Sequence, residues 1–273
     1  MSADDWRESI RAELARLVAT LPENQHPELA GPLFTGPLVG FAAAGDPLFG
    51  RYREIIGTFH RTPGQWLASA GTVICWILPI AAATRVSNRR QQEEPSRDWA
   101  ITRTFGEACN NRLRAELVNW LQLRGHAAVA PVLHPEWGGV EVAGSGPASN
   151  WSERHAAYAA GLGTFSLNDA LITSAGMAHR CGSVVTSLKL PADPRPYVGV
   201  RDWCLFHARG TCAACVKRCP VGAISTSGHD KLRCRDYTYG TLQPRLKERY
   251  GVAIAGCGLC QTGIPCEARN PCV

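Results

Sequence analysis

Hydrophobic and polar positions along the chain follow the periods of helices and strands. Apolar side chains recur at helical spacing over residues 6–18 and again over residues 99–124, which predicts two amphipathic helices. A third helix is expected from Asn150 to Gly161, because Asn150 and Glu153 have the spacing of a capping box.

Short apolar runs rich in β-branched residues predict strands between these helices. Residues 72–78 form a continuous run closed by a proline, which is typical of a strand buried on both faces. Further strands are expected at residues 128–133, 170–174 and 181–190, with a hairpin turn at residues 175–177. The pattern therefore predicts a mixed α+β domain.

A proline-rich segment at residues 191–196 marks the expected end of this domain. We expect residues 1–196 to form the α+β domain and residues 197–273 to form a loop-rich domain held together by cysteines. The apolar stretch 66–83 is interrupted by glycine and proline and is shorter than the roughly 20 residues of a membrane helix. No membrane segment is therefore expected.

Cysteines are concentrated in the second of these domains. The chain of 273 residues contains 12 Cys, and nine of them lie within residues 204–272. The N-terminus reads as an amphipathic helix and lacks an apolar signal segment, so we expect thiols in a reducing cytoplasm rather than disulfides. Cys75 and Cys109 lie in apolar surroundings and are expected in the core.

The formal net charge of +6 is concentrated in the same part of the chain. Residues 201–250 contain ten Lys and Arg against four Asp and Glu. This excess can balance the negative charge of metal–thiolate clusters. The alternatives are docking of an acidic electron donor or of a nucleic acid.

The spacing of the cysteines indicates two [4Fe–4S] clusters. Residues 212–220 match three quarters of the bacterial ferredoxin run, with a proline after the last cysteine, and Cys204 substitutes for the missing first ligand. Because closely spaced cysteines wrap one cluster while the one before proline reaches the other, we assign two sets of four. The first set is Cys204, Cys212, Cys215 and Cys266, and the second is Cys219, Cys234, Cys257 and Cys260; Cys272 could replace Cys266.

Zinc is the alternative occupant of these cysteines. Two CxxC pairs can form a tetrahedral site, but here they are separated by about 40 residues, which is long for a zinc ribbon or knuckle. Zinc also gives no reason for the Cys-Pro pair or for the additional cysteines. The sequence therefore favours iron–sulfur clusters.

At this point the chain resembles the epoxyqueuosine reductase family and its relatives, the reductive dehalogenases. The resemblance rests on CPVGAI and GCGLCQ in the cysteine region and on AGLGTFSLNDALIT at residues 160–173. It implies a nitroreductase-like domain that binds cobalamin noncovalently with its lower base detached, followed by a ferredoxin-like double-cluster domain. A flavin in the first domain is the alternative, since no phosphate-binding G-x-G-x-x-G run decides the matter.

Candidate catalytic residues lie on the helix before the AGLG stretch. His155 and Tyr158 are three residues apart and share a helix face, and Glu153 precedes them. Any of the three could donate a proton to a reduced substrate. The structural alternatives are a helix cap for Glu153, core packing for Tyr158 and a surface position for His155.

Candidate cofactor-binding residues follow on the same motif. Gly161 and Gly163 allow close approach to a bulky cofactor or simply end the helix. Asn168 matches the family asparagine and is expected to bond a corrin amide. Cys181 either faces the cofactor or is a small buried hydrophobe.

These features together predict a cobalamin-dependent reductase supplied with electrons by two clusters. The alternative is an iron–sulfur electron-transfer or activating protein without its own corrinoid. Expected partners are a small-molecule or modified-nucleoside substrate and an external low-potential donor of flavodoxin or ferredoxin type. A tRNA substrate is doubtful, because Pro147 stands where the family has an acidic proton donor and the sequence ends at Val273 without the helical-repeat domain of longer members.

Overall fold

A computed structural model describes residues 2–273 and centres on an antiparallel sheet with strand order β1-β2-β8-β3. The strands are β1 (Leu38–Ala43), β2 (Thr72–Pro79), β8 (His179–Thr186) and the short β3 (Ala128–Val129). β2 pairs with β1 on one side and with β8 on the other, so its backbone is hydrogen-bonded along both edges. The run that predicted a buried strand is the centre of the sheet.

Side chains of β2 point alternately into two hydrophobic cores. Ile74, Trp76 and Leu78 belong to the core on one face, whereas Cys75 and Ile77 belong to the core on the other. This is the period-two alternation of a strand, and all of these side chains are fully buried. A strand between two covered faces therefore has to be apolar at every position.

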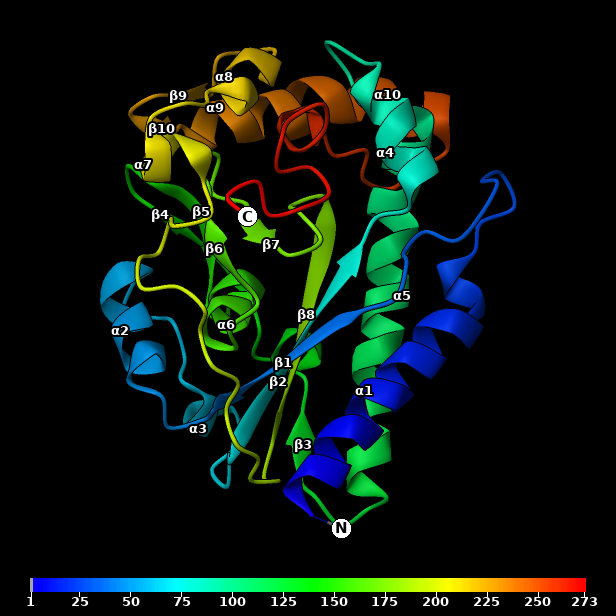
Figure 1. Ribbon diagram of the computed structural model, residues 1–273. Helices are drawn as coiled ribbons and strands as arrows, with labels where there is room; N and C mark the ends of the chain where they lie inside the picture. The colour runs from blue at the N-terminus through cyan, green and yellow to red at the C-terminus, as the bar shows by residue number, and fades with distance from the viewer. Residues whose placement is uncertain (1) are drawn as a thin grey trace.

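Helices cover both faces of the sheet, as Figure 1 shows. The first core is closed by α1 (Ala3–Thr20) and α5 (Arg97–Gln122), and the second by α2 (Pro47–Ile55), α3 (Pro63–Trp66) and α6 (Glu153–Ala159). The N-terminal and long central helices were predicted from their periodicity and are confirmed.

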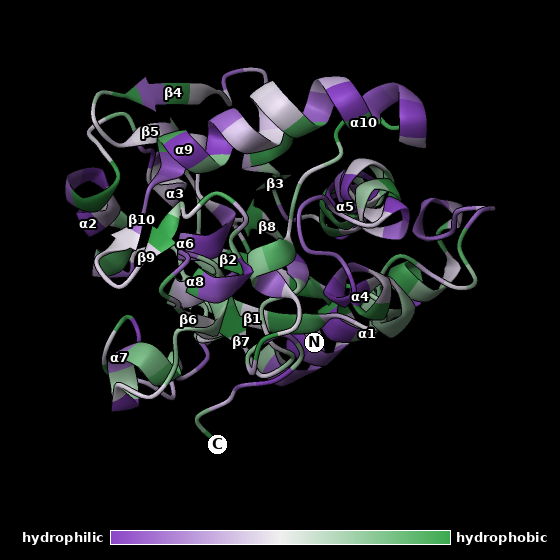
Figure 2. Ribbon diagram, turned by 90° about the horizontal axis from the view of Figure 1, so that it is seen from above, coloured by the Kyte–Doolittle hydropathy of each residue, from purple (hydrophilic) through white to green (hydrophobic). Residues whose placement is uncertain are grey.

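The cysteine-rich segments lie across one end of this sandwich, at the top of Figure 1. They are not an isolated unit, because Leu242 and Leu246 pack into the same core as α1 and α5. In Figure 2 α10 runs past the end of α5 and is largely hydrophilic. The helices here are α7 (Leu205–Arg209), α8 (Ala214–Arg218), α9 (Lys231–Arg235), a π-helix (Asp236–Leu242) and α10 (Gln243–Tyr250), and the strands are β9 (Ile224–Ser225) and β10 (Gly228–His229).

Several local predictions differ from the structure. The expected strand at 128–133 is only β3, because Pro131 begins a 3-10 turn and offers no N–H to a ladder. The expected cap at Asn150 is wrong: α6 begins after Ser152, and the Asn150 side chain instead bonds Glu136 and Gly138. No element was predicted over residues 134–149, where the structure has a hairpin of β4 (Gly139–Val142) and β5 (Gly146–Ser149).

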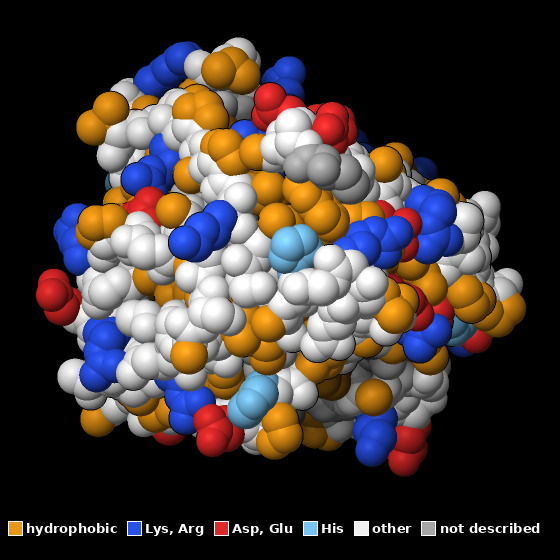
Figure 3. Space-filling model, turned by 90° about the horizontal axis from the view of Figure 1, so that it is seen from below, with side chains coloured by type: hydrophobic (Ala, Val, Ile, Leu, Met, Phe, Trp, Pro, Cys, Tyr) orange, Lys and Arg blue, Asp and Glu red, His pale blue; other side chains and the backbone are white. Residues whose placement is uncertain are grey.

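The remaining elements connect the two parts. β6 (Gly163–Phe165) and β7 (Leu171–Thr173) form a small hairpin, and α4 (Ala82–Arg89) lies in the polar stretch after β2. Within residues 2–273, no helix combines the length and apolar character needed to cross a bilayer. On the face opposite the cysteine-rich end, Figure 3 shows positive and negative side chains interspersed.

Candidate functional site

The first set of cysteines gathers around one small cavity. Cys204, Cys212, Cys215 and Cys266 all line it, although Cys266 lies more than 50 residues beyond Cys215 in the sequence. Burial, followed by the neighbouring thiols of Cys215, Cys204 and Cys212, raises the pKa of Cys266 to about 12. These side chains are therefore close enough to influence one another's charge.

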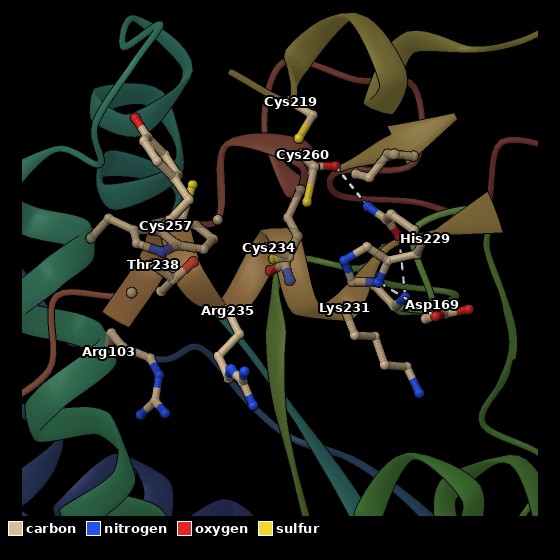
Figure 4. Close-up of a pocket in the computed structure, with 18 of the residues that line it drawn as sticks. Arg103, Asp169, Cys219, His229, Lys231, Cys234, Arg235, Thr238, Cys257 and Cys260 are labelled. Atoms are coloured by element: carbon tan, nitrogen blue, oxygen red, sulfur yellow. Dashed lines mark hydrogen bonds and ion pairs between the residues drawn. The ribbon is translucent and has the colours of Figure 1, made fainter. Parts of the chain in front are cut away.

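The second set is assembled in the same way. Cys219, Cys234, Cys257 and Cys260 line a larger cavity, which we call the cysteine-side cavity (Figure 4). Burial raises the pKa of Cys260 well above its usual value, and the other three thiols add to this shift, as does Cys215 of the first set. The two sets are therefore neighbours.

Four thiols in each set are the donor set that a [4Fe–4S] cluster requires, so the residues fit this group. Backbone amides already point at two of the sulfurs. Ala214 N–H donates to Cys212 Sγ at 3.5 Å and Ala223 N–H donates to Cys219 Sγ at 3.2 Å. Such bonds stabilise thiolate charge. In the described part of the chain, 2–273, no three His, Cys, Asp or Glu side chains converge on a single-ion site.

Cys266 is brought to the first set by the turn between β7 and β8. Met177 N–H donates to the Cys266 carbonyl at 2.9 Å, and Ala178 N–H donates to the Glu267 carbonyl at 3.1 Å. Gly176 in this turn has φ of +82°, and a Cβ there would lie 2.3 Å from the Glu267 carbonyl oxygen. The cysteine loop therefore docks directly onto the sheet domain.

Cys272 lies at the edge of the first set. The pKa of its thiol is raised by burial, and Cys204 is the cysteine whose charge acts on it. It does not line the small cavity that Cys266 shares with the other three. This geometry favours Cys266 over Cys272 as the fourth ligand.

The cysteine-side cavity has a volume of about 420 Å³ and is lined by cations as well as thiols. In Figure 4 the side chains of Arg103, Arg235 and Lys231 extend away from the four cysteines. Arg154 and Arg180 also line the cavity. These cations come from α5, α6, β8 and α9, so the cavity is built between the sheet domain and the cysteine-rich segments.

One carboxylate, Asp169, faces this cavity from the loop between β6 and β7. Its φ of +60° is in the left-handed region, which is uncommon for a residue other than glycine. Its carboxylate lies 3.4 Å from Nδ1 of His229. Burial raises the pKa of Asp169, but the bond to His229 and the charges of His229, Lys231 and Arg154 outweigh this and lower it.

A second cavity of about 790 Å³ adjoins the first, and we call it the aromatic cavity. It lies between α2, α6, β5 and the segment after residue 194. Pro147, Arg154, Asp169 and Lys231 line both cavities, so the two form one continuous trough. The two cavities together exceed the usual range for small-ligand sites, roughly 300–1,000 Å³, so the trough has room for a large cofactor.

Two of the predicted catalytic residues lie in the aromatic cavity. His155 and Tyr158 both line it. Burial raises the pKa of Tyr158 and lowers that of His155 to about 3, so Tyr158 holds its proton near neutral pH and His155 is uncharged. Nδ1 of His155 lies 2.7 Å from the Ser152 hydroxyl, whereas no hydrogen bond from the Tyr158 hydroxyl is found within residues 2–273.

Glu153 is on the other side of α6 and, in the described chain, does not reach either cavity. Its carboxylate accepts from the buried guanidinium of Arg114 at 3.1 Å, and Arg114 also bonds Glu107 at 2.9 Å. Burial raises the pKa of Glu153 despite this partner. The expected role as cap or proton donor is therefore replaced by a buried ion pair that ties α6 to α5.

The predicted cofactor contacts at Gly161, Gly163 and Cys181 are not borne out by their positions, since none of them lines either cavity in residues 2–273. A Cβ on Gly161 would lie 2.5 Å from the Pro194 carbonyl and one on Gly163 would lie 2.1 Å from the Ile172 carbonyl. These glycines allow backbone segments to pack. Cys181 is half-buried at the edge of the second core, and burial raises the pKa of its thiol to about 12.

Asn168 lines the cysteine-side cavity, but its side chain is used within the protein. Nδ2 donates to the Cys260 carbonyl at 2.9 Å, and Oδ1 accepts from Ala170 N–H at 3.1 Å. It therefore links the AGLG motif to the second cysteine set, in place of the bond to a corrin amide that we expected.

Sequence reasoning missed several lining residues. Arg103, Arg154, Arg180, Lys231 and Asp169 come from separate elements and carry no motif of their own. One signal was the basic excess over residues 201–250, which includes Lys231. Asp169 could have been found from its place beside Asn168.

Comparison with known proteins supports the resemblance. Epoxyqueuosine reductases from Bacillus anthracis and Francisella cf. novicida (strain Fx1) are 31% and 33% identical to the chain over 119 and 128 residues, which is 42% and 44% of this chain. These matches span only 29% and 33% of the relatives' own length. No family model matches the chain.

Solved structures share the fold. A selenomethionine-labelled epoxyqueuosine reductase superposes with a TM-score of 0.58 at 19% identity, covering 97% of this chain and 66% of that one. A catabolic reductive dehalogenase in complex with 3-bromo-4-hydroxybenzoic acid gives a TM-score of 0.55 at 17% identity, covering 85% of this chain and 30% of that one. The similarity to this family that the motifs predicted is confirmed, in sequence over part of the chain and in fold over nearly all of it.

Proposed function

We propose that this chain, which resembles epoxyqueuosine reductases and reductive dehalogenases, is an oxidoreductase that uses two [4Fe–4S] clusters and cobalamin to reduce an organic substrate. Its similarity to both groups of reductases supports the general activity. The single observation that carries the proposal is the trough: the second cysteine set lines one end of it, and Tyr158 lines the other.

Electrons would enter at the first cysteine set and leave from the second. Only the second set lines the cysteine-side cavity within the described chain, and Cys215 of the first set lies close enough to Cys260 to influence its charge. An external low-potential donor of flavodoxin or ferredoxin type would supply the first set. The excess of Lys and Arg over residues 201–250 suits an acidic donor.

The trough formed by the two cavities would hold the cobalamin, since the cysteine-side cavity alone is too small for it. When bound, cobalamin supplies a strongly reducing metal centre that can break bonds the protein cannot attack itself. Arg103, Arg154, Arg180 and Lys231 would hold its polar edge through hydrogen bonds to amide oxygens, and the apolar side chains of Ile80 and Ile224 offer surface for a macrocycle.

Tyr158 would supply the proton. A two-electron reduction that leaves a new C–H bond on the substrate consumes one proton, and the phenol of Tyr158 is protonated and faces the cavity. His155 is uncharged at neutral pH and Glu153 points away, so neither is suited to this step. Water at the open mouth of the cavity would return the proton to the phenolate.

The substrate would be a small molecule or a modified nucleoside. Similar structures include an epoxyqueuosine reductase with an epoxyqueuosine-modified tRNA stem loop and the dehalogenase with a brominated hydroxybenzoic acid. Pro147, which replaces the family's acidic residue, lines both cavities. The chemistry at this point therefore differs from that of the tRNA enzymes, which favours another substrate.

The proposal is tested by anaerobic reconstitution with iron, sulfide and hydroxocobalamin, followed by metal analysis and electron paramagnetic resonance. We expect about eight iron atoms and one cobalt per chain, with a base-off Co(II) signal. Eight iron atoms without cobalt would favour the alternative electron-transfer protein. Zinc in place of iron would overturn both.

A further inference from the structure

A network of ion pairs runs from the interior of the sheet domain to the wall of the cysteine-side cavity. It consists of two carboxylates and two guanidinium groups, in the order Glu153, Arg114, Glu107 and Arg180. Arg180 lines the cavity, whereas Glu107 and Arg114 line neither cavity within residues 2–273. The network therefore joins a residue that a ligand can touch to residues that it cannot.

Arg114 is the fixed point of this network. Its side chain is only 2% exposed, and it makes five hydrogen bonds, as many as a guanidinium has N–H donors. The acceptors are the side chains of Glu107, Asn111 and Glu153 and the carbonyl of Cys181. Because they belong to α5, α6 and β8, Arg114 cannot move without breaking bonds to three elements.

Glu107 divides its two carboxylate oxygens between the two guanidinium groups. Oε1 accepts from Arg114 at 2.9 Å, and Oε2 accepts from Arg180. Arg103, one turn earlier on α5, adds a third positive charge and itself lines the cavity (Figure 4). Burial acts to raise the pKa of Glu107, but the three cations outweigh this and lower it, so the carboxylate is ionised at neutral pH.

Arg180 is bonded much less completely than Arg114. Within residues 2–273 its guanidinium makes a single hydrogen bond, the one to Glu107, so the other N–H groups can donate to a ligand in the cavity. Its backbone is held in β8 opposite Leu78, but the long side chain has many rotamers. The charge of Arg103 opposes that of Arg180, and Glu107 offsets it. Glu107 therefore selects the rotamer that lies at the cavity wall.

We propose that Glu107 is a positioning residue, which holds the guanidinium of Arg180 at the cavity wall as a hydrogen-bond donor to the bound cofactor. This rests on the proposed function insofar as the cofactor is cobalamin, whose amide oxygens are acceptors. Glu107 acts without touching the ligand, and Arg114 and Glu153 hold it in place. Equal numbers of positive and negative groups lower the cost of burying the network.

The test measures the affinity of hydroxocobalamin for the full-length protein reconstituted with iron and sulfide, by absorbance titration. Arg180→Gln removes the donor and should weaken binding at least about tenfold, the effect of one hydrogen bond to a charged group. Glu107→Gln should weaken it about fivefold, because an amide has a single acceptor oxygen and turns N–H groups toward the second guanidinium.

A double-mutant cycle separates positioning from stability. In the Arg180→Gln background, Glu107→Gln should change the affinity less than about twofold, since no donor is left to position. It should still lower the midpoint of urea unfolding, because the bond to Arg114 is lost in either background. An equal loss of affinity in both backgrounds would show that Glu107 only supports the fold, which overturns the proposal.

Glu116→Gln is the matched control. Glu116 lies on the same helix α5, is paired with Arg112 at 2.6 Å and lines neither cavity in the described chain. This variant should bind hydroxocobalamin as the parent does. A loss of affinity equal to that of Glu107→Gln would mean that any change of charge on α5 suffices, and it would also overturn the proposal.

Crystal structures of the reconstituted parent and of Glu107→Gln, both without cobalamin, test the positioning directly. The guanidinium of Arg180 should lie at the cavity wall in the parent and turn away from it in the variant. The same position in both would contradict the proposal. A parent that takes up no cobalamin, together with a displaced Arg180 in the variant, would support the role of Glu107 while contradicting the proposed function.

Discussion

At the scale of single residues, the proposed reaction depends most on Tyr158. Its phenol is buried and protonated at one end of the trough, and no hydrogen bond from its hydroxyl is found within residues 2–273. Its neighbours differ: the Tyr52 hydroxyl donates to the His155 carbonyl at 2.8 Å, and Glu153 is held by Arg114.

Tyr158→Phe should therefore lower the rate of substrate reduction by about 100-fold or more, the usual contribution of a positioned acid. Cobalt and iron contents should stay unchanged. Tyr52→Phe, in the same cavity, should change the rate by only a few-fold. A Tyr158→Phe protein with the parent rate, measured under excess reductant, would remove the phenol from the mechanism.

A second question at this scale is whether Cys266 or Cys272 is the fourth ligand in the first cysteine set. Cys266 shares a cavity with three other cysteines, and Cys272 does not. Cys266→Ala should therefore lose about four iron atoms per chain, while Cys272→Ala should retain the parent content. Iron analysis and cluster spectra after anaerobic reconstitution decide this, and loss of iron from Cys272→Ala alone would reverse the assignment.

At the scale of elements, the turn between β7 and β8 joins the sheet to the cysteine loop. The turn was predicted at residues 175–177, and Gly176 with its φ of +82° confirms it. The sequence did not show that Glu267 would pack against this glycine, because that contact joins positions about 90 residues apart. Local pattern therefore defined the turn but not its partner.

Gly176→Ala should weaken the contact between the β7–β8 turn and the cysteine loop at Glu267. The new Cβ would clash with the Glu267 backbone, and the positive φ adds strain of about 1–3 kcal/mol. We expect a lower midpoint of urea unfolding and reduced iron in the first cluster. Gly240→Ala is the control, since a Cβ there meets nothing within 4 Å and φ is not positive; an equal loss in this variant would contradict the explanation.

At the scale of the whole molecule, the buried His60 and the half-buried His155 and His179 make the stability depend on pH. Burial lowers the pKa of His60 to about 4, of His155 to about 3 and of His179 to about 4. The folded protein keeps these rings neutral, whereas the unfolded chain takes up protons below about pH 6.5. Keeping these rings unprotonated in the folded protein therefore has no free-energy cost above pH 6.5. The cost rises, and the stability falls, as the pH decreases toward 4.

Urea unfolding at pH 7.5, 6.5 and 5.5 should show stability falling below pH 6.5. Each histidine contributes at most about 1.4 kcal/mol per pH unit, and the sign follows because the unfolded state binds more protons. His155→Gln should make the decline shallower. An identical slope in this variant would mean that His155 is protonated in the folded state.

The sequence by itself determined the elements whose signals are local. Periodicity defined α1, α5 and β2, because a helix or strand with one or two buried faces must repeat its apolar residues at a fixed spacing. Cysteine spacing predicted two sets of thiols and left Cys266 and Cys272 as alternatives for one position, and each predicted set lines one cavity. The motifs also identified the resemblance that sequence and structure comparisons support.

Only the tertiary structure decided which side chains line the trough around the proposed reacting groups. The trough draws Arg103 from α5, Arg154 from α6 and Lys231 from α9, and no spacing in the sequence relates them. Folding also turned Glu153 away from the cavity and used Gly161 and Gly163 for backbone packing. The physical reason is the same in each case: a helix face or a glycine has several possible partners, and long-range packing selects one.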